Sequence, residues 1–348
     1  MEEFGTVQTV KGAVPAHELG LVLPHEHMFN DLSSVVTSPS YKFSRESVES
    51  KVSPSIQWTL KQDPYCCIDN VAPKPVEDVI QEVRLFQQAG GGTIVDATGT
   101  SKIGRSPSRL LEVSHATGLH VVMSTGPYLE KFEQEDITHR TAEQIAESIL
   151  GELRNGVDGV RAGMIGEIGV SPDFTAGEKN ALRGASLAQL EEPGVAMNIH
   201  MPGWQRRGDE VLDIVLGDHG VDPKKVALAH SDPSGADHEY QRRLLRRGVW
   251  LEFDMIGLDI TFPGEGISPS ISQTADAVAA LVANGYGDQI LVSHDLFLKQ
   301  MWAMNGGNGF QVVPTVFLEL LVQRGVAEDQ ARALVTVNPQ RYLGSGTP

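Results

Sequence analysis

Eight short, largely apolar runs recur along the chain, and most of them are followed by a stretch with helical periodicity. The runs span residues 20–23, 92–97, 120–125, 162–168, 195–200, 225–230, 249–253 and 289–293. Near-continuous apolar runs are typical of strands buried on both faces, as in a parallel sheet. Alternating strands and helices predict βαβ units, and eight of them favour a closed α/β TIM (β/α)8 barrel. An open, doubly wound sheet is the alternative, but no Gly-x-Gly-x-x-Gly follows the first run.

The length of 348 residues suits one such barrel, because an α/β barrel routinely exceeds 250 residues as a single domain. We therefore expect one domain over residues 1–348. Residues 29–75 follow the first run and are weakly periodic and rich in Ser and Pro. We predict that they form an insertion that acts as a lid or a dimer contact, with a disordered loop as the alternative. Cys66 and Cys67 lie in this segment, and the sequence identifies no base that would activate them.

Charge and composition narrow the class of protein. The chain has 28 Lys and Arg against 45 Asp and Glu, and the net charge of −17 disfavours binding to nucleic acid or to an anionic membrane. No apolar run approaches 18 residues, and the first residues resemble no signal peptide. Two adjacent cysteines exclude a disulfide scaffold and favour a reducing compartment. We expect a cytoplasmic protein that acts on a small molecule.

Side chains that can bind metal ions stand at or within the ends of five of the eight runs. They are His25 and His27 after the first run, Glu167 in the fourth, His200 and His230 at the ends of the fifth and sixth, and Asp295 after the eighth. The carboxyl ends of barrel strands share one face, so these side chains should lie close together. Two histidines at positions i and i+2 of a strand point the same way, as a shared metal ion requires.

Each of these residues has a simpler interpretation when it is taken alone. A single histidine more often packs or forms a hydrogen bond at the rim, and a buried carboxylate often belongs to a structural ion pair. However, no Lys or Arg occurs at the ends of these five runs to form such pairs. Four imidazoles and two carboxylates on one face of a barrel therefore favour a metal site.

This set of residues resembles the ligand set of the binuclear amidohydrolase superfamily and, more narrowly, of the phosphotriesterase family and its phosphotriesterase-related proteins. Pro24-His25-Glu26-His27 is similar to the first strand motif of the family, and the similarity extends over residues 7–343. The other segments that carry it are 162–171, 229–232, 251–257, 290–295, 306–310 and 338–339. Many members have a carboxylated lysine on the fourth strand, whereas Glu167 resembles the subgroup with glutamate there. This departure makes phosphotriesterase activity less expected.

The resemblance implies a role for each ligand. His25, His27 and Asp295 would hold one divalent metal ion, His200 and His230 would hold a second, and Glu167 would bridge the two. The first expectation for a His-rich site is zinc, with manganese, cobalt and iron as alternatives. A hydroxide that bridges the ions would attack the substrate, and Asp295 would carry its proton to the leaving group. Glu167 and Asp295 are thus the expected catalytic residues.

Further residues at the same face are candidates for contacts with substrate or with the ligands. Tyr128, Trp204 and Lys299 are predicted to bind substrate, Lys299 through an anionic group, with loop packing as the alternative for each. Asp232 and Asp254 are expected to hydrogen-bond metal-binding histidines. His294 should point away from the barrel interior if the strand alternates.

The predicted function is hydrolysis of a small amide, lactone or carboxylic ester, and the resemblance favours an amide such as an N-acyl amino acid. The first alternative is a phosphotriesterase that acts on organophosphate triesters. A non-catalytic metal- or ligand-binding barrel is the second. A Schiff-base aldolase would need a lysine inside the barrel, and none is visible at the run ends. The resemblance also implies a homodimer.

Overall fold

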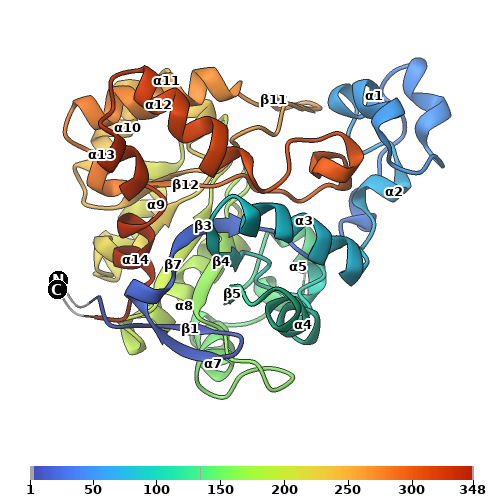
Figure 1. Cartoon of the computed structure of the whole chain (residues 1–348). Coiled ribbons are helices and arrows are strands. Elements are labelled where there is room, and N and C mark those ends of the chain that lie inside the picture. The colour runs from blue at the N-terminus through green and yellow to red at the C-terminus, as the bar shows by residue number, and fades with distance from the viewer. Residues whose placement is uncertain (1–3, 134, 347–348) are drawn as a thin grey trace.

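The eight apolar runs form one eight-stranded sheet in which all neighbouring strands are parallel. The computed structural model describes residues 4–133 and 135–346 (Figure 1). In chain order the strands are β3 (Leu21–Glu26), β4 (Gly91–Asp96), β5 (His120–Thr125), β6 (Met164–Gly169), β7 (Ala196–His200), β8 (Val226–Leu228), β9 (Trp250–Phe253) and β12 (Ile290–Val292). The strands pair in their order along the chain from β3 to β12, whereas a doubly wound sheet changes direction at a central strand. This order confirms the barrel and rejects the open sheet.

Hydrogen bonds connect the first strand to the segment that follows the last one. The amide of Asp295 donates to the carbonyl of His25 (3.2 Å), and the amide of His25 donates to Ser293 Oγ (3.2 Å). The sheet therefore nearly closes into a TIM barrel at its carboxyl-terminal end, between the two segments that carry candidate metal ligands.

Helices surround the strands (Figure 1). The main ones are α3 (Val76–Gln88), α4 (Pro107–Thr117), α7 (Ala142–Arg154), α8 (Ala176–Glu191), α9 (Gly208–Leu212), α10 (His238–Leu245), α11 (Ile271–Ala283), α12 (Leu318–Gln323), α13 (Glu328–Ala333) and α14 (Val337–Leu343). Their start sites are encoded locally, because capping boxes begin α7, α8 and α11 at Thr141, Thr175 and Ser270. No helix among the described residues is long and apolar enough to cross a bilayer.

Apolar side chains fill the barrel interior toward its amino-terminal end. One buried residue from each strand belongs to a single cluster: Val22, Val95, Val122, Met164, Ala196, Ala227, Trp250 and Leu291. Val7 of strand β1 (Thr6–Thr9) and Tyr342 of α14 belong to the same cluster. The hairpin of β1 and β2 (Gly12–Pro15) and helix α14 thus cover this end, which leaves the opposite end for a site.

Residues 29–75 contain short helices, including α1 (Gln57–Gln62) and α2 (Ile68–Val71), which lie to one side of the barrel (Figure 1). Leu60, Cys66 and Cys67 are buried together and form a small separate core. Burial raises the pKa of the Cys66 thiol to about 11, so this cysteine is packed rather than activated. Lys61 of α1 forms an ion pair with Asp259, next to the hairpin of β10 (Thr261–Phe262) and β11 (Gly266–Ile267).

Gly166 on β6, which directly precedes Glu167, tests how much the close packing of β6 against β7 contributes to stability. It has φ of +126°, and a Cβ atom there would lie 2.3 Å from the carbonyl oxygen of Asn198 on β7. We expect Gly166→Ala to lower the free energy of unfolding by about 2 kcal/mol or more, measured by urea denaturation. Gly151→Ala is the matched control, because Gly151 lies in α7 with open space around it, and should raise stability by up to about 1 kcal/mol. Equal stability of wild type and Gly166→Ala would contradict the prediction.

Candidate metal centre

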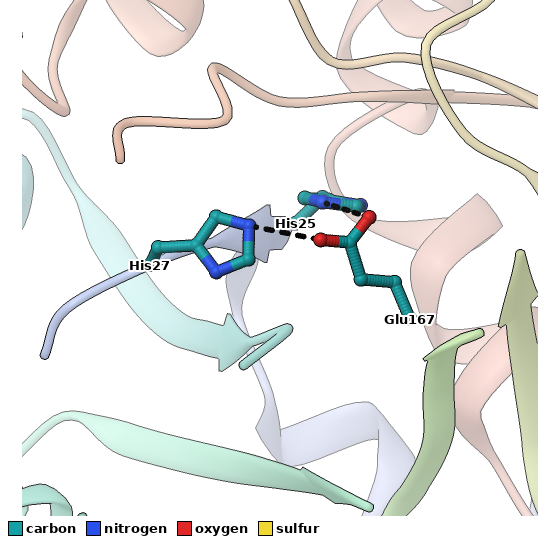
Figure 2. Close-up of side chains that lie close together, drawn as sticks. All are labelled: His25, His27 and Glu167. Carbon is teal, nitrogen blue, oxygen red and sulfur yellow. Dashed lines mark ion pairs between the residues drawn. The ribbon is translucent and has the colours of Figure 1, made fainter. Parts of the chain in front are cut away.

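The side chains of His25, His27, Glu167 and Asp295 converge at the carboxyl ends of the strands. Figure 2 shows the rings of His25 and His27 directed toward the carboxylate of Glu167, with separations of 3.6 Å from His25 Nε2 and 3.3 Å from His27 Nε2. Asp295 Oδ1 lies 3.8 Å and 3.1 Å from the same two nitrogens. One donor atom each of His25, His27 and Glu167 lies within 4.8 Å of the others, so these three side chains could hold a metal ion, and Asp295 lies beside the two histidines.

A second group of donors shares Glu167 with the first. His200 Nδ1 lies 2.9 Å and His230 Nε2 lies 3.4 Å from Glu167 Oε2. The two imidazole nitrogens are themselves 2.8 Å apart. Glu167 therefore contacts both groups of donors through one carboxylate.

Two observations show that this donor set fits metal ions. His25 Nε2 is buried and has no hydrogen-bond partner among the described residues, although it faces the donor cluster. In addition, four buried carboxylates contact the histidines of the cluster, and in the part of the chain that the structure describes their ion-pair partners are all histidines. These carboxylates are Glu167, Glu252, Asp254 and Asp295. Two divalent cations would balance their four negative charges.

The carboxylates also change the protonation of the histidines. Burial lowers the pKa values of His25 and His27, but the surrounding carboxylates raise them more strongly, to about 10 and about 9. Burial lowers the pKa of His200, which is the most exposed of the four. The site thus attracts positive charge, either as protons on the imidazoles or as metal ions.

Residues behind the donors hold the imidazole rings by their other nitrogens. Asp254 accepts a hydrogen bond from His230 Nδ1 (2.9 Å) and lies 3.5 Å from His25 Nδ1, as expected of a residue that orients ligands. Glu252, two residues earlier, accepts from His25 Nδ1 (3.0 Å). Sequence reasoning missed Glu252, although a carboxylate inside the apolar run 249–253 was a visible signal.

The backbone is strained at two of the donors. His230 and Asp295 have φ of 55° and 54°, in the left-handed region that non-glycine residues rarely adopt. Glu26 holds the segment around Asp295, because it accepts bonds from Ser293 Oγ, from the amide and Nδ1 of His294, and from the amide of Leu296 (2.7–3.0 Å). His294 points to Glu26 rather than to the donors. Sequence reasoning also missed Glu26.

Two of the other predicted residues lie elsewhere than expected. Lys299 pairs with Asp69 of α2 (3.0 Å) and is absent from the described lining of the cavity above the donors, because the chain turns into a 3-10 helix (Lys299–Met301) after β12. Asp232 accepts from the amide of Met255 (3.1 Å) and from Thr274 Oγ1 (2.9 Å), not from His230. These contacts connect the loops after β8 and β9, so Asp232 has a structural position.

A cavity of about 1020 Å³ lies above the donors. His27, Glu167, His200, His230 and Asp295 line it, and Tyr128 and Trp204 are part of its wall. The Tyr128 hydroxyl lies 3.3 Å from His200 Nδ1. The two aromatic residues predicted to bind substrate therefore both face this space.

A (β/α)8 barrel with shared carboxylate and imidazole donors at its carboxyl end defines a class, the metal-dependent hydrolases of this fold. The sequence model described as the phosphotriesterase family matches residues 5–343, and the chain belongs to that family. Enzymes of the family use divalent metal ions, and this chain is a metal-dependent hydrolase.

Similar proteins cover nearly the whole chain. The N-acetyltaurine hydrolase of Danio rerio is 32% identical, over 97% of this chain and 98% of that protein. A crystal structure of a resiniferatoxin-binding protein from Rhodobacter sphaeroides is 40% identical, with a TM-score of 0.94 over 98% of this chain and 95% of that one. An organophosphorus hydrolase from Deinococcus radiodurans is 27% identical, with a TM-score of 0.76 over 99% and 98%.

The metal content of variants tests the donor assignment. We expect zinc-loaded wild type to hold about two ions per chain after dialysis, and His200→Ala to hold about one, because only the second group loses a donor. The measurement is elemental analysis by mass spectrometry. His115→Ala removes an exposed histidine of α4 and should leave the content unchanged. If His200→Ala retained the full zinc content, His200 would not be a ligand.

Proposed function

We propose that this chain hydrolyses a carbonyl substrate, an amide, lactone or carboxylic ester, at two divalent metal ions. His25, His27 and Asp295 would hold one ion, His200 and His230 the other, and Glu167 both. When bound, zinc or a similar ion would supply Lewis acidity and an activated water. The observation that carries the proposal is the position of the Glu167 carboxylate between the two groups of donors.

Asp295 is suited to moving a proton between the attacking water and the leaving group. Its carboxylate borders the cavity, and its Oδ1 atom lies 3.1 Å from His27 Nε2. The hydrogen bonds to Glu26 fix the adjacent backbone, so the carboxylate would keep its orientation during the reaction.

Tyr128 is suited to donating a hydrogen bond to the substrate. Burial, together with the negative charges of Glu167 and Asp295, raises the pKa of Tyr128 well above its ordinary value. The phenol therefore keeps its proton at neutral pH and can donate to a carbonyl oxygen or a leaving group near His200.

Among carbonyl substrates, the comparisons support an amide first, because N-acetyltaurine hydrolase is named for cleaving one. The organophosphorus hydrolase supports a phosphotriester as the second candidate. The Rhodobacter protein is named for binding, which supports a ligand-binding barrel as the third. Turnover assays on amides, lactones, esters and paraoxon with the zinc-loaded protein separate the three, and zinc binding without turnover would favour the third.

We also propose that residues 29–75 are an insertion within a single barrel domain. Leu32, Val35, Thr37 and Tyr65 from this segment border the cavity, in support of a role near the substrate. We further propose a cytoplasmic homodimer. The unpaired Cys66 and Cys67 support a reducing compartment, and the resemblance to the family supports the dimer.

Replacing Asp295 tests its role in proton transfer. We expect Asp295→Asn to lower kcat by about 10²–10⁴-fold, because the amide cannot accept a proton, while the thermal midpoint stays near that of wild type. Zinc content measured in parallel distinguishes lost proton transfer from a lost ion. Asp218→Asn, at an exposed position beside α9, should have wild-type activity. Wild-type turnover by Asp295→Asn would remove Asp295 from the mechanism.

Removing one hydroxyl tests Tyr128. We expect Tyr128→Phe to lower kcat/KM by about 10- to 100-fold, because one donor to the substrate is lost while the ring remains. Steady-state kinetics on the best substrate measure the change. Tyr41→Phe is the matched control, because Tyr41 is exposed and stacks on Phe43 outside the cavity. Unchanged kinetics for Tyr128→Phe would make Tyr128 a packing residue.

A further inference from the structure

We infer that the substrate carries a bulky, uncharged, apolar group, and that this group binds against an aromatic wall formed by Trp204, Phe262 and Phe297. The inference rests on the proposed hydrolase function and narrows its substrate class. The size of the cavity, the arrangement of the aromatic rings and the charges along the lining support it.

The cavity is large for a small N-acyl amino acid. Sites that bury drug-sized ligands commonly have volumes of about 300–1,000 Å³, and this cavity of about 1020 Å³ lies at the upper end. An acetyl amide with a two-carbon side chain would leave most of the space above the donors empty or filled with water. A larger substrate would use the space to displace water from apolar walls.

Aromatic rings line the cavity on the side of the β10–β11 hairpin. The rings of Trp204 and Phe262 have centroids 5.1 Å apart, and those of Phe262 and Phe297 are 6.3 Å apart. All three are only half-buried, so part of each ring faces the cavity. The hairpin backbone lies directly on the indole, because a Cβ atom at Gly266 would be 2.1 Å from Trp204 Nε1. The three rings thus form one wall, defined here as the aromatic wall.

A second pair of rings continues the apolar lining down to the metal donors. Tyr128 and Phe132 have centroids 5.5 Å apart, and the ring of Tyr128 packs against His200 with centroids 4.9 Å apart. A flat apolar group could therefore pack on rings while the bond to be cleaved lies near the donors.

The charges on the lining disfavour an anionic substrate. Apart from the metal donors, the charged residues that border the cavity are Glu130, Lys131, Asp173, Glu178 and Glu265. Four of these five are carboxylates, and Lys131 is exposed with its ammonium 5.0 Å from the centroid of Phe132. Lys299, the cation expected to receive an anionic group, pairs with Asp69 instead. Away from the metal donors, a sulfonate or carboxylate on the substrate would meet more repulsion than attraction from these side chains.

Three acetamides that differ only at the end of an ethyl group provide the test. They are N-ethylacetamide, N-acetyltaurine with a terminal sulfonate, and N-[2-(2-naphthyl)ethyl]acetamide; the three matching acetate esters form a parallel set. We expect kcat/KM of zinc-loaded protein to be at least about 10- to 100-fold higher for the naphthyl compound than for the unsubstituted one in each cleaved set. The sulfonate should give no increase. Equal rates, or a preference for the sulfonate, would overturn the inference.

Failure of the proposed function has a different signature. If none of the six compounds is cleaved by zinc-loaded protein, the hydrolase proposal for amides and esters fails, and calorimetric binding of the same acetamides still tests the wall. Tighter binding of the naphthyl compound than of N-ethylacetamide would support the wall, and equal binding would overturn it.

Substitutions in the aromatic wall test whether the naphthyl group binds there. We expect Phe262→Ala to raise KM for the naphthyl compound about tenfold and to change N-ethylacetamide kinetics little, because only the larger compound reaches the ring. Phe262→Leu should recover part of the loss, which separates lost apolar contact from a disturbed hairpin. Phe43→Ala removes an exposed phenylalanine outside the cavity and should change neither substrate. A Phe262→Ala protein with wild-type KM for the naphthyl compound would exclude this wall as the binding surface.

Discussion

The buried carboxylate of Glu167 is the contact on which the rest of the site depends. An isolated carboxylate in the interior of a barrel would be very costly, because it has lost its hydration. Burial alone would raise the pKa of the Glu167 carboxyl. The histidines around it lower that pKa by more than burial raises it, to well below the ordinary value, so the group stays charged. Four imidazoles from β3, β7, β8 and their ends lie within 3.6 Å of its two oxygens. The negative charge of Glu167 thus determines where the four imidazoles lie.

The polar cluster is possible because the rest of the barrel is apolar and closed. One apolar residue from each strand fills the interior below the site, so packed apolar side chains rather than water lie beneath the donors. Glu252, Asp254 and Glu26 then form a layer that binds the outer nitrogens and the strained segment of Asp295. This layer keeps the donors in place before a metal ion binds, which reduces the reorganisation that binding requires.

Much of the fold and the clustering of the candidate donors could be predicted because both are encoded locally. Apolar runs mark strands buried on both faces, and His25, His27 and Asp295 stood out as polar residues directly after such runs. The partners of these residues could not be predicted, because Glu26 and Glu252 act on residues more than 200 positions away. Lys299 illustrates the same limit. It lies only four residues from Asp295, but the turn that directs it to Asp69 depends on the packing of α2.

In the proposed function, the strand ends supply the chemistry and the loops supply the specificity. The donors are attached to strand ends whose positions the closed sheet fixes, whereas the aromatic wall comes from the segments after β7, β9 and β12. A change in the β10–β11 hairpin can alter the size and charge of the cavity without moving Glu167 or its histidines. Proteins with similar barrels can therefore act on different compounds, as the names of the relatives of this chain illustrate.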